Sequence, residues 1–205
     1  PEVETVVRGL RKLVGLTIEK VELFLGARDI YDTEQLLGCK LLSVKRYGKY
    51  LLFYFSSDLV MISHLRMTGQ FIIASNSTEK GNLFNKHSHV LFSFSDETYL
   101  LFNDQRKFGT IEVLPESMLS DYFVSRKLGP DALLELPFFE DFVKLLDRKK
   151  NMPIKTALLD QTVLLGLGNI YAQELCFIGK VDPSTLCSEV PLAKLQLIHE
   201  AIVPL

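Results

Sequence analysis

The segment NDQRKFGT, residues 103–110, follows the apolar run TYLLF and places an arginine, a lysine and a phenylalanine in succession before a glycine. A flat ring such as Phe108, beside the guanidinium of Arg106 and complemented by Met67, suits an enzyme that opens a duplex and fills the gap left by an extruded base. Core packing is the ordinary role of a methionine, so that alternative stays open for Met67. The chemistry indicated is recognition of an opened nucleic-acid helix.

Histidines occur in two further segments. ISHLRMTG, residues 62–69, alternates as a strand does, so His64 shares one face with Arg66 and Thr68. A partly buried, hydrogen-bonded histidine would explain His64 equally well. KHSH, residues 86–89, spaces two histidines two apart, as a metal site could, but no third ligand lies near them in the sequence. We therefore expect no metal there.

Basic residues gather in KLLDRKKNMPIK, residues 144–155, against one acid. This pattern is typical of a solvated helix face, and it also fits an edge that binds phosphates. KRYGKY, residues 45–50, holds Lys49 at a Tyr-Gly turn, which fits an ordinary surface hairpin and equally a lysine that approaches phosphates.

LLGLGNIYAQE, residues 164–174, has two glycines around Leu167 and then Asn169, which we expect to cap a new helix and present amide donors to an anion. An ordinary joint between two helices explains the same pattern.

Composition limits the class of protein. The chain has 205 residues, 47% of them hydrophobic and 23% charged, which is ordinary for a globular protein. A net charge of -2 argues against indiscriminate coating of nucleic acid. The three cysteines are widely spaced without a CxxC pair, and no apolar run approaches the roughly 18 residues of a membrane span. We expect a soluble, cytoplasmic protein.

The elements that position these residues fall into two domains. One amphipathic helix is predicted over residues 1–14, followed by eight short β-rich runs up to residue 114. The chain then turns helical, in the segments 117–128, 138–149, 154–164, 168–179 and 190–203. The predicted class is α+β: an N-terminal helix with an eight-stranded β-sandwich over 1–115, then an all-helical domain over 116–205.

Seven motifs together resemble the bacterial formamidopyrimidine-DNA glycosylase family, and the resemblance runs from Pro1 to about Pro183. In order they are PEVETVVRGL, RYGKYLLF, ISHLRMTGQF, KHSHV, DQRKFGT, KLGPDAL and IKTALLDQTVLLGLGNIYAQE. The resemblance implies a bifunctional DNA glycosylase and apurinic-site lyase that acts on 8-oxoguanine and ring-opened purines in duplex DNA. It also implies that the helical domain is a helix-two-turns-helix domain.

The resemblance further implies roles for individual residues. Lys49 contacts the phosphate at the lesion and assists elimination. Met67 and Arg106 occupy the vacated space, Arg106 meets the orphaned cytosine, and Phe108 wedges a base step. Glu4 lies near the damaged base. The remaining DNA contacts are His64, His87, Lys150, Lys155 and Asn169.

The family attacks the sugar with the amine of an N-terminal proline, assisted by the adjacent glutamate. It begins Pro-Glu-Leu-Pro-Glu-Val-Glu-Thr, whereas this sequence begins PEVET, so Pro1 and Glu2 are the stand-ins for the catalytic pair. The family also carries a four-cysteine zinc finger that is absent here. We therefore expect a chain truncated at both ends, with no cofactor of its own, since the family's one structural zinc belongs to that finger.

Two hypotheses of function follow. The first is a monomeric, nucleoid-associated repair glycosylase and lyase that binds duplex DNA containing oxidised purines or abasic sites and has no membrane partner. The second is a catalytically inactive module that binds DNA or abasic sites. An unstable product with neither property is a third possibility.

Overall fold

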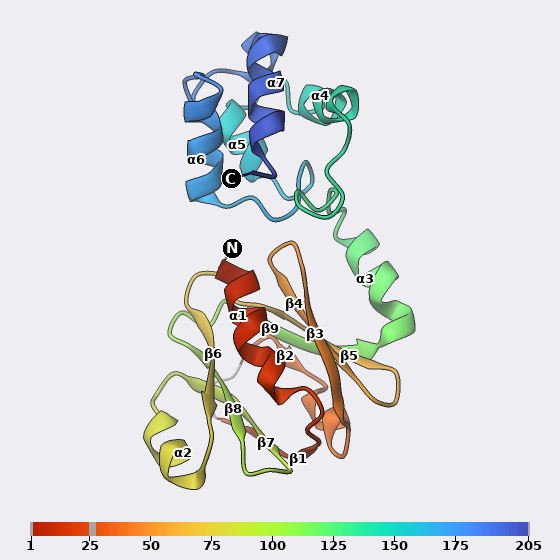
Figure 1. Cartoon of the computed structure of the whole chain (residues 1–205), viewed down its shortest axis with the longest axis vertical. Coiled ribbons are helices and arrows are strands. Elements are labelled where there is room, and N and C mark those ends of the chain that lie inside the picture. The colour runs from red at the N-terminus through yellow and green to blue at the C-terminus, as the bar shows by residue number, and fades with distance from the viewer. Residues whose placement is uncertain (1, 25–27, 205) are drawn as a thin grey trace. The chain divides into compact units, whose positions relative to one another are not determined.

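The computed structural model describes residues 2–24 and 28–204 (Figure 1). The chain divides into two compact units, Pro1–Asp121 and Tyr122–Leu205, called unit 1 and unit 2 below.

Unit 1 contains two sheets. The four-stranded sheet has the order β1-β7-β8-β6 and is antiparallel; the five-stranded sheet has the order β2-β9-β5-β4-β3, with β2 parallel to β9. The strands are β1 Ile18–Leu23, β2 Ile30–Tyr31, β3 Leu41–Tyr47, β4 Tyr50–Phe55, β5 Leu59–His64, β6 Gly69–Ala74, β7 Ser88–Phe94, β8 Tyr99–Asp104 and β9 Thr110–Pro115. Within the described ranges there are nine strands: the eight expected runs and β2.

The core of unit 1 is built from the apolar residues of both sheets and of one helix. Phe53, Phe92 and Phe102 are among its largest fully buried side chains. Helix α1, Glu2–Leu10, buries Val7 and Leu10 in the same cluster and contacts β3 and β4 (Figure 1). The helix is shorter than the one predicted over residues 1–14, because α1 ends at Leu10 and a 3-10 turn, η1 Arg11–Leu13, follows it.

Helix α2, Ser77–Leu83, was not predicted from the sequence. The side chain of Asn76 accepts a hydrogen bond from the Glu79 amide at 2.8 Å, and Glu79 Oε2 accepts one from the Ser75 amide at 2.8 Å. These two bonds form a reciprocal cap, whose Asn-x-x-Glu spacing is visible in the sequence.

The strand order brings two loops together. β5 ends beside the start of β9, where His64 pairs with Thr110, and β6 begins beside the end of β8, where Gly69 pairs with Asp104. The 65–68 loop and the 105–109 loop each pass from one sheet to the other between these two pairs. They must therefore lie side by side, although about 40 residues separate them in the sequence.

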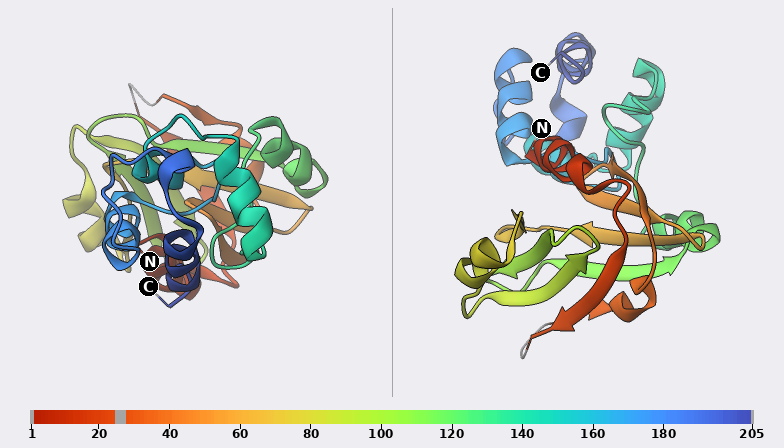
Figure 2. Two further views of the ribbon diagram at one scale, coloured as in Figure 1. Left: turned by 90° about the horizontal axis from the view of Figure 1, so that it is seen from above. Right: turned by 60° about the horizontal axis from the view of Figure 1, so that its bottom comes forward.

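In the described part of unit 2 the main regular elements are helices, which pack around one core (Figure 2). The helices are α4 Phe139–Asp147, α5 Ile154–Leu159, α6 Asn169–Ile178 and α7 Leu192–Ala201, while α3 Leu119–Ser125 spans the boundary between the units. α5 stops five residues earlier than predicted because Asp160 and Gln161 begin a turn. The Asp160 carboxylate accepts hydrogen bonds from the amide and the hydroxyl of Thr162.

Candidate nucleic-acid interface

Met67, Arg106 and Phe108, called the plug below, meet at the surface of unit 1. Arg106 Nη1 lies 2.9 Å from Met67 Sδ, and Arg106 Cζ lies 4.9 Å from the centre of the Phe108 ring. Met67 is 72% exposed and Phe108 is 53% exposed. Met67 is thus not a core residue, and the structure brings the three side chains together where an incoming ligand can reach them.

The backbone beneath the plug is wrapped around one buried carboxylate, that of Asp104. Its Oδ2 accepts hydrogen bonds from the amides of Phe108 at 2.8 Å and Gly109 at 2.7 Å, and its Oδ1 accepts from the Arg106 amide at 3.1 Å and from the Thr68 hydroxyl. Burial acts to raise the pKa of Asp104, but these hydrogen bonds outweigh it and hold the pKa below its usual value. The carboxylate therefore stays charged near neutral pH.

Gly109 is required by close packing at the base of the 105–109 loop. A Cβ at this position would lie 2.7 Å from Cζ of Phe102 and 3.1 Å from Asp104 Oδ2. Any larger residue would displace a buried ring or the carboxylate that holds the loop.

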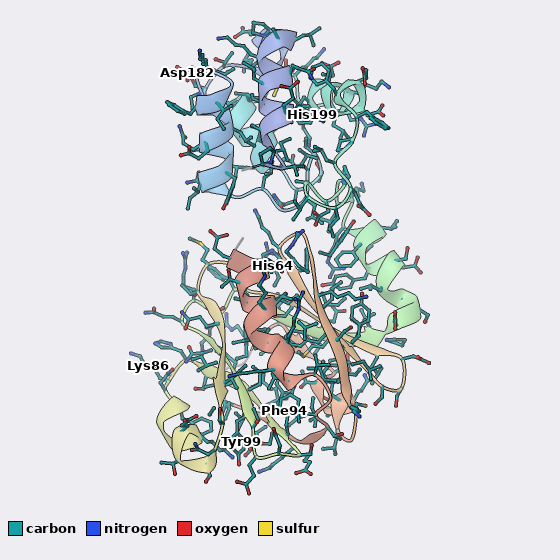
Figure 3. All side chains as sticks on the ribbon, viewed as in Figure 1. His64, Lys86, Phe94, Tyr99, Asp182 and His199 are labelled. Carbon is teal, nitrogen blue, oxygen red and sulfur yellow. The ribbon has the colours of Figure 1, made fainter. Side chains whose placement is uncertain are left out.

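Lys49 and His64 lie close together at one end of β4 and β5. Lys49 is in the two-residue turn of the β3–β4 hairpin, after Gly48 with φ 56°. His64 pairs with Tyr50 across the strands, and the two rings are 4.8 Å apart, edge to face (Figure 3 labels His64).

The surroundings of this pair lower the pKa of both side chains. Burial, together with the positive charges of Arg66 and Lys49, lowers the pKa of His64 to about 4. Burial also lowers the pKa of Lys49, as does Arg66, while Glu2 raises it. His64 Nδ1 accepts a hydrogen bond from the Arg66 amide at 3.0 Å, so the ring proton of neutral His64 is on Nε2 and can be donated to a ligand.

The acidic residues of α1 differ in their surroundings. Glu2, the first helical residue, is exposed and close enough to Lys49 to act on its pKa. Glu4 is half-buried, and its Oε1 lies 3.0 Å from Arg8 Nε, one turn along the helix. Pro1 lies outside the described residues.

His87 and His89 have separate surroundings. His87, next to Lys86 (labelled in Figure 3), is half-buried in the loop before β7, and its carbonyl accepts a hydrogen bond from the Asp104 amide at 2.9 Å. His89 is buried, and its Nε2 lies 2.7 Å from the carbonyl oxygen of Asp104. Both histidines therefore hold β8 beneath the plug.

In unit 2 two of the five basic residues between 144 and 155 form ion pairs. Lys144 lies 2.7 Å from Asp141, and Lys149 lies 2.7 Å from Asp160. Lys150 is exposed in the turn after α4. Lys155, on α5, donates from Nζ to Gln173 Oε1 on α6 at 2.8 Å, so it links the two helices whose junction the sequence singled out.

Asn169 is exposed at the start of α6, as expected, but it does not cap the helix. Gly168 takes the cap position without a side-chain hydrogen bond, and Asn169 is the first helical residue. The extended backbone of Gly168, with φ -110° and ψ 176°, thus places the helix cap one residue earlier than predicted. The side chain of Asn169 thus projects from the first turn.

Sequence reasoning missed two residues that organise these segments. Asp104 is the first, and the signal was an acid before a short turn ending in glycine. Gln161 is the second: its Nε2 donates to the carbonyls of Leu159 and Leu167, and its Oε1 accepts from the Gly166 amide. A glutamine within a helical pattern carried no such signal.

The residues present do not fit the zinc site of the resembled family. Among residues 2–24 and 28–204, no three His, Cys, Asp or Glu side chains are grouped as a metal site would require. The three cysteines are buried and unpaired, one in unit 1 and two in unit 2. Nor does any helix of the described chain have the length and apolar character needed to cross a bilayer.

Comparison with known proteins assigns both units. Residues 1–111 match the formamidopyrimidine-DNA glycosylase N-terminal domain, and residues 128–205 match the formamidopyrimidine-DNA glycosylase H2TH domain. Curated relatives include the formamidopyrimidine-DNA glycosylases of Ligilactobacillus salivarius, 40% identical over 208 residues, and of Streptococcus agalactiae, 39% identical over 210 residues. Each alignment covers 99% of this chain and 74% of the relative.

Solved structures agree. The Lactococcus lactis enzyme in complex with DNA containing Fapy-dG is 32% identical, with a TM-score of 0.89. This match covers 100% of this chain and 77% of the Lactococcus lactis chain. The same enzyme bound to DNA containing an abasic site is 33% identical with a TM-score of 0.89, and the match covers 100% of this chain and 78% of the other.

A two-sheet unit with its N-terminal helix, joined in sequence to a helix-two-turns-helix unit, defines a class of base-excision DNA glycosylases. The match extends through both units at about 40% identity. The chain belongs to the formamidopyrimidine-DNA glycosylase family, whose members are DNA repair enzymes.

Proposed function

We propose that this chain removes oxidised purines, 8-oxoguanine and formamidopyrimidines, from duplex DNA and then cleaves the abasic site. The observation that carries the proposal is the plug: a thioether, a guanidinium and a phenyl ring in mutual contact at an exposed position. Groups of this kind replace the stacking and pairing that a duplex loses when a base is flipped out. The structures of the Lactococcus lactis enzyme with Fapy-dG and abasic-site DNA support the substrate class.

Within this proposal, each plug side chain has its own task. Phe108 wedges a base step, Met67 fills the space left by the flipped nucleotide, and Arg106 donates hydrogen bonds to the base that lost its partner. The cation–π contact between Arg106 and Phe108 keeps the guanidinium close to the ring while both remain accessible.

The covalent step requires an unprotonated amine as nucleophile. We assign it to the amine of an N-terminal proline, with Pro1 as the candidate in this chain and Glu2 as the candidate proton carrier. The amine attacks the anomeric carbon of the sugar, the glycosidic bond breaks, and the base leaves with a proton. The sugar ring then opens: the bond between the anomeric carbon and the ring oxygen breaks, the oxygen takes up a proton, and the anomeric carbon forms a Schiff base with the amine. The Schiff base makes the neighbouring C–H acidic, so the flanking phosphates are lost by successive eliminations.

Phosphate contacts position the duplex for this chemistry. In unit 1 we assign them to Lys49, His64 and His87, with Lys49 at the phosphate of the lesion, and we assign Glu4 to the surroundings of the damaged base. In unit 2 we assign them to Lys150, Lys155 and Asn169. We also propose that the protein works as a monomer in the bacterial cytoplasm, which light scattering and cell fractionation test.

The first experiment compares two duplexes that differ only in a stable abasic-site analogue opposite cytosine. Phe108→Ala should weaken binding of the abasic duplex by about tenfold, because base–aromatic stacking contributes roughly 1–3 kcal/mol, and should weaken binding of undamaged duplex by far less. Phe138→Ala, which removes a ring that is 81% exposed in unit 2, is the control. Equal loss on both duplexes would rule out the wedge role.

The second experiment tests catalysis. Borohydride reduction in the presence of duplex containing 8-oxoguanine should trap a covalent complex of protein and DNA. Absence of the complex, with salt-sensitive binding retained, would instead identify a binding module without lyase chemistry.

A further inference from the structure

We propose that Asp104 is the positioning residue of the plug: its buried carboxylate fixes both plug loops in their working arrangement before DNA arrives. The inference rests on the proposed function, because it concerns how the plug is prepared for an opened duplex. Asp104 itself is 1% exposed and is not expected to touch DNA.

The carboxylate is bound by the plug's own backbone. Three of its four donors are amides of the 105–109 loop, those of Arg106, Phe108 and Gly109. They surround Lys107, whose φ of 58° lies in the left-handed region that L residues adopt rarely. The bonds to Asp104 therefore stabilise a turn that the chain would otherwise seldom adopt.

Thr68 connects the second loop to the same carboxylate. Its hydroxyl donates to Asp104 Oδ1 and accepts a hydrogen bond from the Arg106 amide at 3.1 Å. Because Met67 is the residue before Thr68, this bridge also fixes the backbone that carries the Met67 thioether. One carboxylate thus sets the position of all three plug residues.

Asp104 is in turn held firmly by its own backbone. Its amide donates to the His87 carbonyl at 2.9 Å, and its carbonyl accepts a hydrogen bond from Nε2 of the buried His89 at 2.7 Å. It also pairs with Gly69 at the start of β6. The backbone of Asp104 is therefore fixed by β6, β7 and its own strand β8 of the four-stranded sheet. The carboxylate holds the plug loops to this rigid sheet.

The plug side chains cannot supply this order themselves. Among the described residues, Arg106 contacts the Met67 sulfur and the Phe108 ring, and thioether sulfur is a weak acceptor. Loops that are ordered only on binding lose affinity through the entropy of ordering. Fixing the backbone before binding removes that loss of affinity. The gain applies to an opened duplex, which contacts the plug, and not to an undamaged duplex.

A carboxylate and an asparagine amide of nearly the same shape would behave differently at position 104. A carboxylate has only acceptors, which suits four donors, whereas the asparagine amide would direct an NH₂ group at some of them. Asp104→Asn should therefore weaken binding of the abasic duplex about tenfold, because it disrupts charge-assisted hydrogen bonds, and should change binding of undamaged duplex less than threefold. Asp131→Asn is the matched control, because Asp131 is also buried and accepts amides of its own turn, in unit 2. It should lower the melting temperature without changing the ratio of the two affinities.

A double-mutant comparison separates positioning from a general loss of structure. In the Phe108→Ala background, Asp104→Asn should change the affinity ratio much less than it does in the unchanged protein, because the group it positions is already gone. Thr68→Val should reproduce a smaller part of the loss, and Thr68→Ser, which keeps the hydroxyl, should restore the ratio. If Asp104→Asn does not fold, the two Thr68 variants decide the question through the same bridge.

The inference is overturned if Phe108→Ala lowers the affinity ratio but Asp104→Asn and Thr68→Val leave it unchanged. It is also overturned if the effect of Asp104→Asn is undiminished in the Phe108→Ala background. Failure of the proposed function is distinct, since in that case Phe108→Ala itself would not discriminate between the two duplexes.

Discussion

The plug of unit 1 consists of large, exposed side chains, whereas the candidate contacts of unit 2 are polar groups at helix ends and turns. Met67 and Phe108 are mostly exposed and nonpolar. Lys155, in the first turn of α5, carries a charge, and Asn169, the first residue of α6, carries an amide. A wedge acts only where a duplex can be opened, while an ammonium or an amide binds phosphate on any duplex. We therefore propose that lesion selectivity comes from the plug of unit 1 and that unit 2 contributes general affinity for duplex DNA.

Both segments are organised by one side chain, but the chemistry of the two side chains differs. Asp104 only accepts, and it binds a loop that directs three of its amides at the carboxylate. Gln161 donates to two carbonyls and accepts from one amide, and it holds a turn whose carbonyls also point inward. The direction of the loop's peptide groups thus determines whether an acid or an amide is required.

The largest effect is expected at Gly109, which tests whether the plug loop tolerates any change beneath it. Gly109→Ala should lower the free energy of unfolding of unit 1 by about 3 kcal/mol, because the new methyl group overlaps the buried Phe102 ring. Hydrogen exchange of the β5 and β9 amides measures the loss. Gly9→Ala is the control, since nothing lies within 4 Å of its Cβ, and should instead stabilise α1 by about 0.5–1 kcal/mol.

The next effect tests the organising residue of unit 2. Gln161→Leu should weaken the binding of both duplexes about equally, by about 2 kcal/mol. The substitution leaves two carbonyls and an amide beside α6 without their hydrogen-bond partner. Titration of both duplexes measures it, and Gln196→Leu, which removes an amide bonded to Glu200 on α7, is the control. A change in the affinity ratio would contradict the division between the two units.

An effect of similar size concerns His64 and pH. Its folded pKa of about 4 lies below the value of 6.5 for the free side chain, so the unfolded chain binds more protons between these values. Stability should fall as the pH drops from 6.5 to 4, by about 2 kcal/mol once screening by water is allowed for. His64→Asn, which keeps an acceptor for the Arg66 amide, should remove that part of the pH dependence. Urea unfolding at several pH values measures it, and an unchanged slope would refute the buried, neutral histidine.

The smallest effect concerns a single phosphate contact. Lys155→Met should reduce the slope of log affinity against log salt by about 0.9, equally for abasic and undamaged duplex. Lys144→Met is the control, because Lys144 is paired with Asp141. An unaltered slope for Lys155→Met would remove Lys155 from the set of phosphate contacts.

Prediction from the sequence succeeded where local patterns were strong. Eight strands and the helices of unit 2 were expected from alternation and from apolar residues three and four apart, and the structure contains them. Prediction failed for short elements: β2 has two residues and gains its order from pairing with β9, and α2 depends on a cap rather than on an apolar face. The start of α6 moved by one residue because a glycine can take the cap position.

By itself the sequence determined the residue types of the plug, the order of the strands along the chain and the family, because each of these is written in local pattern or motif. Only the tertiary structure decided that Met67 reaches Arg106 and that Asp104 lies beneath them both. The 65–68 and 105–109 loops are about 40 positions apart in the sequence. They meet because β5 ends beside the start of β9 and β6 begins beside the end of β8. Strand pairing is a property of the whole sheet, so no local pattern contains it.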